Sequence, residues 1–182
     1  MIIDQVKEAI KLAGESPNIP DRSELCQNGQ SFTPFLYRFI ILTDPKTVLE
    51  WGPGNSTHLF LNTSKDVKVF SYEHAEEWYT HWTNELMKEF GDRCNITLAT
   101  DEKEYVSPDF PEETFDIIFV DGIWRDQCIK NNIKLLKKET GTLMMHDSHR
   151  DYIEMDVKGL EYISTYVDKI QPIEHVAIWR RK

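Results

Sequence analysis

A glycine-rich turn stands directly between a predicted strand and a predicted helix in the segment Val48-Leu49-Glu50-Trp51-Gly52-Pro53-Gly54-Asn55-Ser56-Thr57. Gly52 and Gly54 let the backbone turn sharply and approach a ligand with no side chain in between. The helix that follows offers free N–H groups at its positive end, and Asn55 or Ser56 can cap it. The segment therefore predicts a strand, a ligand-binding turn and a helix in that order.

Short apolar runs alternate with helical patterns after this turn, which is typical of strand-helix-strand units in a parallel sheet. We predict parallel strands at Thr47 to Trp51, Val67 to Tyr72, Ile96 to Ala99, Phe115 to Val120 and Thr142 to His146. Helices are predicted at Ser56 to Asn62, Ala75 to Phe90 and Arg125 to Lys137. Two last strands, Tyr162 to Asp168 and Glu174 to Arg181, are joined too tightly for a crossover, so we expect an antiparallel hairpin.

The first 45 residues are predicted to form a helical extension. One helix begins at Ile2 and ends near Gly14, and a second has Thr33 as its cap and Pro34 at its first helical position. We therefore expect an α/β fold with a doubly wound, mostly parallel seven-stranded sheet, in a single domain of residues 1–182 with its core at 46–182. This extension either packs on the sheet, or it forms a lid over the acceptor site that includes Phe35, Tyr37 and Arg38.

The charge and cysteine content narrow the class of protein. The 182 residues include 31 acidic and 21 basic side chains, a formal net charge of -10, which argues against nucleic acid as the main partner. An odd number of cysteines, Cys26, Cys94 and Cys128, favours free thiols in a reducing compartment. No apolar run suits a signal peptide or a membrane span. We expect a cytoplasmic protein with a small-molecule partner and no membrane partner, and the oligomeric state stays open.

Acidic residues end the first three predicted strands. Glu50 could hold the ammonium group of an amino-acid ligand directly or through water. Glu73 ends the second strand, where an acid commonly accepts hydrogen bonds from ribose hydroxyls in such folds. Asp101 follows the third strand, where it could take an adenine amino group. The acids and the turn together suit a nucleoside that carries an amino-acid group.

The pattern acid-x-Gly-x-Gly at Glu50 to Gly54 resembles that of the class I S-adenosylmethionine-dependent methyltransferases. Further blocks are similar to one bacterial-type branch of that family: Ser71-Tyr72-Glu73-His74 with Trp78-Tyr79, Val120-Asp121-Gly122 with Arg125 and Cys128, and His146-Asp147-Ser148-His149-Arg150. The resemblance runs from Thr47 to the C-terminus. It implies a Rossmann-like methyltransferase fold, S-adenosylmethionine as cofactor, and methyl transfer to an unidentified acceptor, with O-methylation of a small molecule slightly favoured.

The resemblance and the strand ends together give a set of cofactor residues: Glu50, Gly52, Pro53, Gly54, Asn55, Ser56, Thr57, Glu73, His74, Asp101, Asp121 and Trp124. Trp124 could stack on the adenine or on the acceptor, whereas Trp78 and Trp82 are expected in the core. A dinucleotide-dependent oxidoreductase is one alternative. The dinucleotide-binding motif, however, has a third small residue at the position that Thr57 occupies in this chain. A non-catalytic S-adenosylmethionine-binding module is the other.

Ligands of open parallel sheets lie beyond the carboxyl ends of the strands, so the segments after Val120 and Met145 should face the acceptor. The candidate catalytic residues are Asp121, His146, Asp147 and His149, as bases or as orienting groups. Arg125 and Arg150 could hold a carboxylate or phosphate of the substrate. Catechol-type O-methyltransferases place metal-binding acids after the same two strands, followed by Asn where this chain has Ser148. In an alternative reading, Asp121 and Asp147, together with His146, hold a divalent cation that binds two acceptor oxygens, but our main assignment includes no metal ligands.

Overall fold

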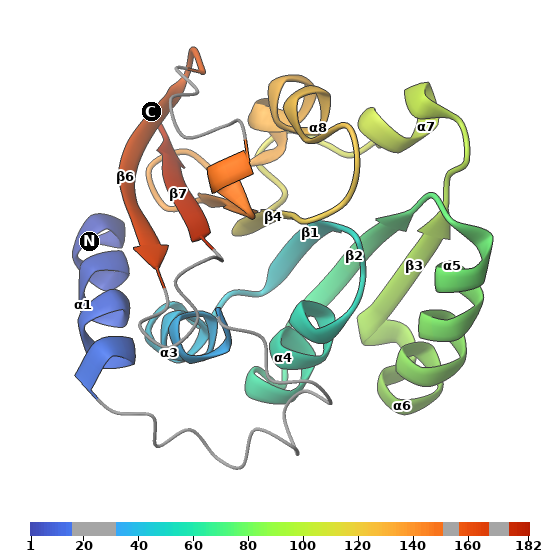
Figure 1. Cartoon of the computed structure of the whole chain (residues 1–182), viewed down its shortest axis with the longest axis horizontal. Coiled ribbons are helices and arrows are strands. Elements are labelled where there is room, and N and C mark those ends of the chain that lie inside the picture. The colour runs from blue at the N-terminus through green and yellow to red at the C-terminus, as the bar shows by residue number, and fades with distance from the viewer. Residues whose placement is uncertain (16–31, 151–156, 168–174) are drawn as a thin grey trace.

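The computed structural model describes residues 1–15, 32–150, 157–167 and 175–182, without the side chain of Arg150. They contain a seven-stranded sheet with the order β3-β2-β1-β4-β5-β7-β6 (Figure 1). The strands are β1 Thr47–Trp51, β2 Lys68–Glu73, β3 Cys94–Leu98, β4 Ile117–Val120, β5 Thr142–His146, β6 Leu160–Val167 and β7 His175–Arg181. The first five run parallel, and β7 pairs antiparallel with both β5 and β6. The predicted sheet and its closing antiparallel pair are confirmed, whereas the segment between the last two strands, residues 168–174, lies outside the described residues.

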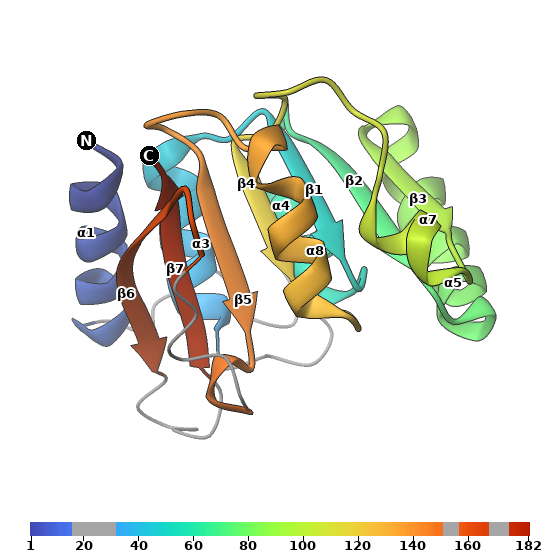
Figure 2. The ribbon, with the colours of Figure 1, turned by 90° about the horizontal axis from the view of Figure 1, so that it is seen from above.

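Helices cover both faces of the sheet (Figure 2). The α-helices are α1 Ile2–Glu15, α3 Thr33–Thr43, α4 Asn55–Thr63, α5 Glu76–Trp82, α6 Lys88–Phe90, α7 Glu102–Val106 and α8 Arg125–Asn132. Successive side chains of a strand point to opposite faces, so Val48 packs in one apolar cluster with α1, α3 and α4, and Leu49 packs in another with α7 and α8. Burial on both faces explains why the parallel strands are nearly continuous apolar runs.

Several element bounds differ from the sequence predictions. The helix expected from Ala75 to Phe90 consists of α5, a π-helical turn at Thr83–Met87, and α6. The helix expected from Arg125 to Lys137 ends its α-helical part at Asn132, before a 3₁₀ turn. Helix α7 was not predicted, because five residues are too few to show a helical period.

The N-terminal helix α3 pads the sheet. Phe35, Leu36, Phe39 and Ile40 are fully buried, and Phe35 stacks on Tyr166 of β6 with 5.1 Å between ring centroids. The predicted cap at Thr33 was one residue late, since the cap is Phe32 and the helix already includes Thr33. Of the two readings of the extension, the described part fits the padding role, and residues 16–31 lie outside the description.

None of the helices in the described ranges is both long enough and apolar enough to cross a membrane.

Candidate functional site

The turn after β1 requires glycine at its first position. Gly52 has φ +86°, and a Cβ atom there would lie 3.1 Å from the carbonyl carbon and oxygen of Asp121. Gly54 is the N-cap of α4, and its N–H donates to Thr57 Oγ1 at 2.8 Å. Asn55 and Ser56, predicted as caps, are instead the first residues inside the helix. The turn thus brings the backbone of β1 against that of β4.

Glu50 lies beneath this turn and is completely buried. Its carboxylate accepts hydrogen bonds from the hydroxyls of Ser56 and Thr57 on α4 and from Ser71 Oγ on β2, the last at 2.8 Å. Burial raises the pKa of Glu50 to about 7, although the hydroxyl donors work in the opposite direction. Glu50 does not line the cavity described next, so its observed contacts hold β1, β2 and α4 together under the turn.

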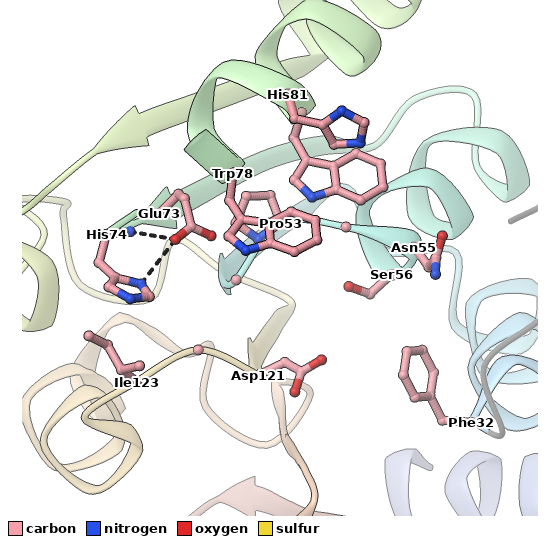
Figure 3. Close-up of a pocket in the computed structure, with 14 residues that line it drawn as sticks. Phe32, Pro53, Asn55, Ser56, Glu73, His74, Trp78, His81, Asp121 and Ile123 are labelled. Atoms are coloured by element: carbon pink, nitrogen blue, oxygen red, sulfur yellow. Dashed lines mark hydrogen bonds and ion pairs between the residues drawn. The ribbon is translucent and has the colours of Figure 1, made fainter. Parts of the chain in front are cut away.

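A cavity of about 540 Å³ opens beyond the carboxyl ends of β1, β2 and β4 (Figure 3). This volume is in the range of small-molecule binding sites. Its lining comes from the glycine turn, the two following strand ends, α5 and the residue before α3, and comprises Phe32, Gly52, Pro53, Gly54, Asn55, Ser56, Glu73, His74, Trp78, His81, Trp82, Asp121, Gly122 and Ile123. Eight of these were predicted as cofactor residues, and the structure brings them to one place.

Glu73 is held at the end of β2 by the start of the next segment. The backbone N–H groups of His74 and Ala75 both donate to Glu73 Oε1 at 2.8 Å, and His74 Nδ1 lies 3.0 Å from the same oxygen. Figure 3 shows the other carboxylate oxygen on the side of Trp78 and Pro53. Glu73 therefore has one oxygen fixed by the chain and the other directed toward the cavity.

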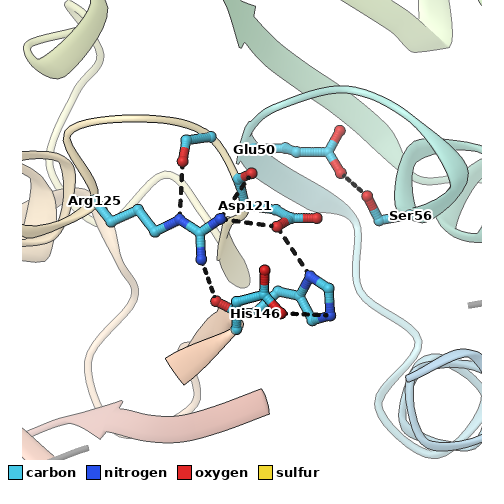
Figure 4. Close-up of polar contacts among 7 residues, drawn as sticks. Glu50, Ser56, Asp121, Arg125 and His146 are labelled. Atoms are coloured by element: carbon cyan, nitrogen blue, oxygen red, sulfur yellow. Dashed lines mark hydrogen bonds and ion pairs between the residues drawn. The ribbon is translucent and has the colours of Figure 1, made fainter. Parts of the chain in front are cut away.

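Asp121, His146 and Asp147 come together where β4 and β5 end, and Figure 4 shows the first two side chains in contact. His146 Nδ1 lies 2.9 Å from Asp121 Oδ1, and His146 Nε2 lies 3.8 Å from Asp147 Oδ1. One ligand atom from each of the three side chains falls within 4.8 Å of the others, which suits a divalent cation. The 2.9 Å contact between Asp121 and His146 suits proton transfer. Asp147 has φ +54°, an uncommon backbone conformation that clusters at functional sites.

Arg125 ties the same two strand ends together. Its Nε donates to the Gly122 carbonyl at 2.8 Å, its Nη1 to the His146 carbonyl at 2.5 Å, and its Nη2 lies 3.3 Å from Asp121 Oδ1. All three nitrogens thus have partners within the chain, and Arg125 does not line the cavity. The geometry fits a clamp between strand ends better than a fork for an acceptor, and the side chain of Arg150 lies outside the description.

Other predicted site residues lie away from the cavity lining. Asp101 is exposed, and its Oδ1 accepts hydrogen bonds from the first turn of α7. Trp124 packs edge-on against Tyr105 with 5.5 Å between ring centroids. The ring of His149 lies 5.1 Å from that of His175 on β7. Cofactor or catalytic roles for these residues stay predictions.

Three aromatic residues that line the cavity were not predicted as site residues. Trp78 is 56% exposed and lines the cavity, so its assignment to the core was wrong. Trp82 is buried, as predicted, yet it also lines the cavity. Phe32 packs edge-on against His146 with 4.7 Å between centroids. For Trp78, the available signal was its place in the helix directly after Glu73.

No family model and no curated protein sequence matches the chain. Solved structures do match it. A candidate caffeoyl-CoA O-methyltransferase from Staphylococcus aureus is 16% identical with a TM-score of 0.66, over 99% of this chain and 92% of that one. An O-methyltransferase from Bacillus cereus in complex with S-adenosylhomocysteine is 15% identical with a TM-score of 0.62, over 98% and 91%.

A third match is TrmN from Thermus thermophilus, 14% identical with a TM-score of 0.62, over 82% of this chain and 49% of that one. The overall fold therefore recurs at very low sequence identity. The chain has the fold of the S-adenosylmethionine-dependent methyltransferases, as the motif resemblance implied.

Proposed function

We propose that the protein is an S-adenosylmethionine-dependent methyltransferase that acts on a small molecule. The observation that carries this proposal is that the glycine turn, Glu73 and Asp121 line one cavity of about 540 Å³ at the carboxyl edge of a methyltransferase-type sheet. Ligands of open α/β sheets bind at this edge. A cytoplasmic location belongs to the same proposal and is supported by the free thiols of Cys94 and Cys128.

The cavity residues fit the parts of S-adenosylmethionine. The open backbone at Gly52 and Gly54, followed by the start of α4, suits the carboxylate of the amino-acid group, because free N–H groups at a helix start attract anions. The oxygen of Glu73 on the cavity side suits the ribose hydroxyls. Asp101 uses Oδ1 to cap α7, and its carboxylate is proposed to reach the adenine amino group. When bound, the cofactor supplies an electrophilic methyl group.

We assign the acid–base role to the pair Asp121 and His146. Asp121 lines the cavity, and its contact with His146 Nδ1 lets the imidazole orient the carboxylate and share a proton with it. A proton lost by an acceptor hydroxyl would pass to this pair, which is why O-methylation is slightly favoured. The same two groups with Asp147 could instead hold a divalent cation that positions acceptor oxygens.

The test of catalysis is release of S-adenosylhomocysteine in the presence of small hydroxyl and amine acceptors. We expect turnover with at least one acceptor, and a loss of about 100-fold or more in kcat for Asp121→Asn. Asp126→Asn, on the exposed side of α8 and paired with Lys130, is the matched control and should keep wild-type turnover. Chelation with EDTA followed by readdition of Mg²⁺ or Mn²⁺ tests whether turnover requires a divalent cation.

Two outcomes would favour the alternatives. Tight binding of S-adenosylmethionine without turnover on any acceptor would support a non-catalytic binding module. Binding of a nicotinamide dinucleotide in preference to S-adenosylmethionine would support an oxidoreductase. Full activity in Asp121→Asn would contradict the assigned base.

A further inference from the structure

Trp78 and Trp82 form an aromatic wall on α5. They are one helical turn apart, with their rings only 13° from parallel and 6.4 Å between centroids. Trp82 is buried, and its ring lies 3.6 Å from the position that a Cβ atom on Gly54 would occupy. The wall is therefore fixed over the glycine turn by its inner member.

The outer member of the wall is exposed in a way that core packing does not explain. Trp78 keeps 56% of its surface accessible although it lines the cavity. A large apolar side chain gains free energy when it is buried, so an exposed tryptophan inside a cavity is more informative than an isolated one on an outer surface. His81 packs edge-on against Trp82 at 4.7 Å and borders the same space. The arrangement suits contact with a ligand.

The charge of the cavity indicates which kind of ligand. Its lining includes the carboxylates of Glu73 and Asp121, and no lysine or arginine occurs among these described residues. The face of an indole ring carries negative potential and attracts cations, most strongly for tryptophan among the aromatic side chains. Carboxylates and indole faces in one cavity therefore favour an organic cation over a neutral or anionic group.

We propose that Trp78, held in place by Trp82, binds the sulfonium of S-adenosylmethionine through a cation–π contact and so distinguishes this cofactor from its neutral product. The inference rests on the proposed function. Trp78 lines the same cavity as Glu73, the residue assigned to the ribose, and as Gly52 to Gly54, the turn assigned to the amino-acid group. The sulfonium joins these two parts of the cofactor. Loss of the charge on methyl transfer then weakens the contact and favours product release.

The test compares the dissociation constants of S-adenosylmethionine and S-adenosylhomocysteine by calorimetry for the wild type and Trp78→Leu. We expect the wild type to prefer S-adenosylmethionine and Trp78→Leu to reduce that preference by roughly fivefold, with little change for S-adenosylhomocysteine. Trp78→Phe should keep part of the preference. Tyr162→Leu, at a similarly exposed aromatic residue on β6 (52% against 56% for Trp78), should keep all of the preference.

If Trp78→Leu lost affinity equally for both ligands, or left the ratio of their dissociation constants unchanged, the cation–π contact would be contradicted. The proposed function would not be affected. A wild-type protein that binds neither ligand would overturn the proposed function together with it. Because Trp78 is more than half exposed, the variant should keep the wild-type circular-dichroism spectrum.

Discussion

At the scale of single residues, the two glycines of the turn meet different demands. Gly52 combines a positive φ with a backbone approach of 3.1 Å, whereas Gly54 has an extended φ and only the ring of Trp82 near its missing side chain. We expect Gly52→Ala to lower the free energy of unfolding by about 1–3 kcal/mol, because both the dihedral angle and the contact are strained. Gly54→Ala should stay within about 0.5 kcal/mol of the wild type. Urea denaturation of both variants tests the difference, and equal losses would refute it.

Glu50 should make stability depend on pH. Its pKa is raised to about 7 in the folded protein from an ordinary value near 4.5, so the folded state holds a proton that the unfolded state releases between these values. Stability is then fully present below about pH 4.5 and falls as the pH rises through 7, by about 3 kcal/mol. Glu50→Gln should remove this slope. Chemical denaturation at pH 5 and pH 8 checks the prediction, which fails if the variant keeps the slope.

The sequence predicted the identity of cavity residues better than their contacts. The turn glycines, Glu73 and Asp121 were recognisable because they follow predicted strands, and parallel strands end at one edge. The clamp formed by Arg125 was not predictable, since two of its partners are backbone carbonyls, those of Gly122 and His146, which leave no mark on the sequence.

At the scale of elements, the contribution of α3 to stability tests whether this helix packs on the sheet or acts as a mobile cover. Phe35 is fully buried between α3 and the sheet, so Phe35→Ala should lower the free energy of unfolding by about 3–5 kcal/mol. Ile41→Ala, at an exposed position of the same helix, should change it by less than about 0.5 kcal/mol. Urea denaturation measures both. A small effect at Phe35 would mean that α3 is not part of the folded core.

The strands were easier to predict than the helices. Five apolar runs and a tight pair of terminal strands identified the whole sheet, because burial on both faces leaves a strong pattern. Helix α7 was missed because its five residues are too few to show a helical period, and its cap Asp101 was interpreted only as a ligand-binding acid. Trp78 was assigned to the core because it shares a helical face with Trp82, and periodicity alone cannot tell which end of such a face reaches a cavity.

At the scale of the whole molecule, one arrangement connects fold and proposed function. The sheet aligns the ends of β1, β2 and β4, and the segments that follow them bring the glycine turn, Glu73 and Asp121 to one cavity, where we propose that Glu73 binds the ribose and Asp121 acts in proton transfer. Solved methyltransferase structures share the fold at 14–16% identity.

Calorimetric titration of S-adenosylmethionine into the wild type and Gly54→Asp tests the central claim most directly. Space for a side chain exists beside Trp82, so the variant should keep its circular-dichroism spectrum, while the added carboxylate occupies the place proposed for the cofactor's own carboxylate and repels it. The account predicts saturable binding to the wild type and none to the variant. Undiminished affinity in Gly54→Asp, or no binding to the wild type, would contradict it.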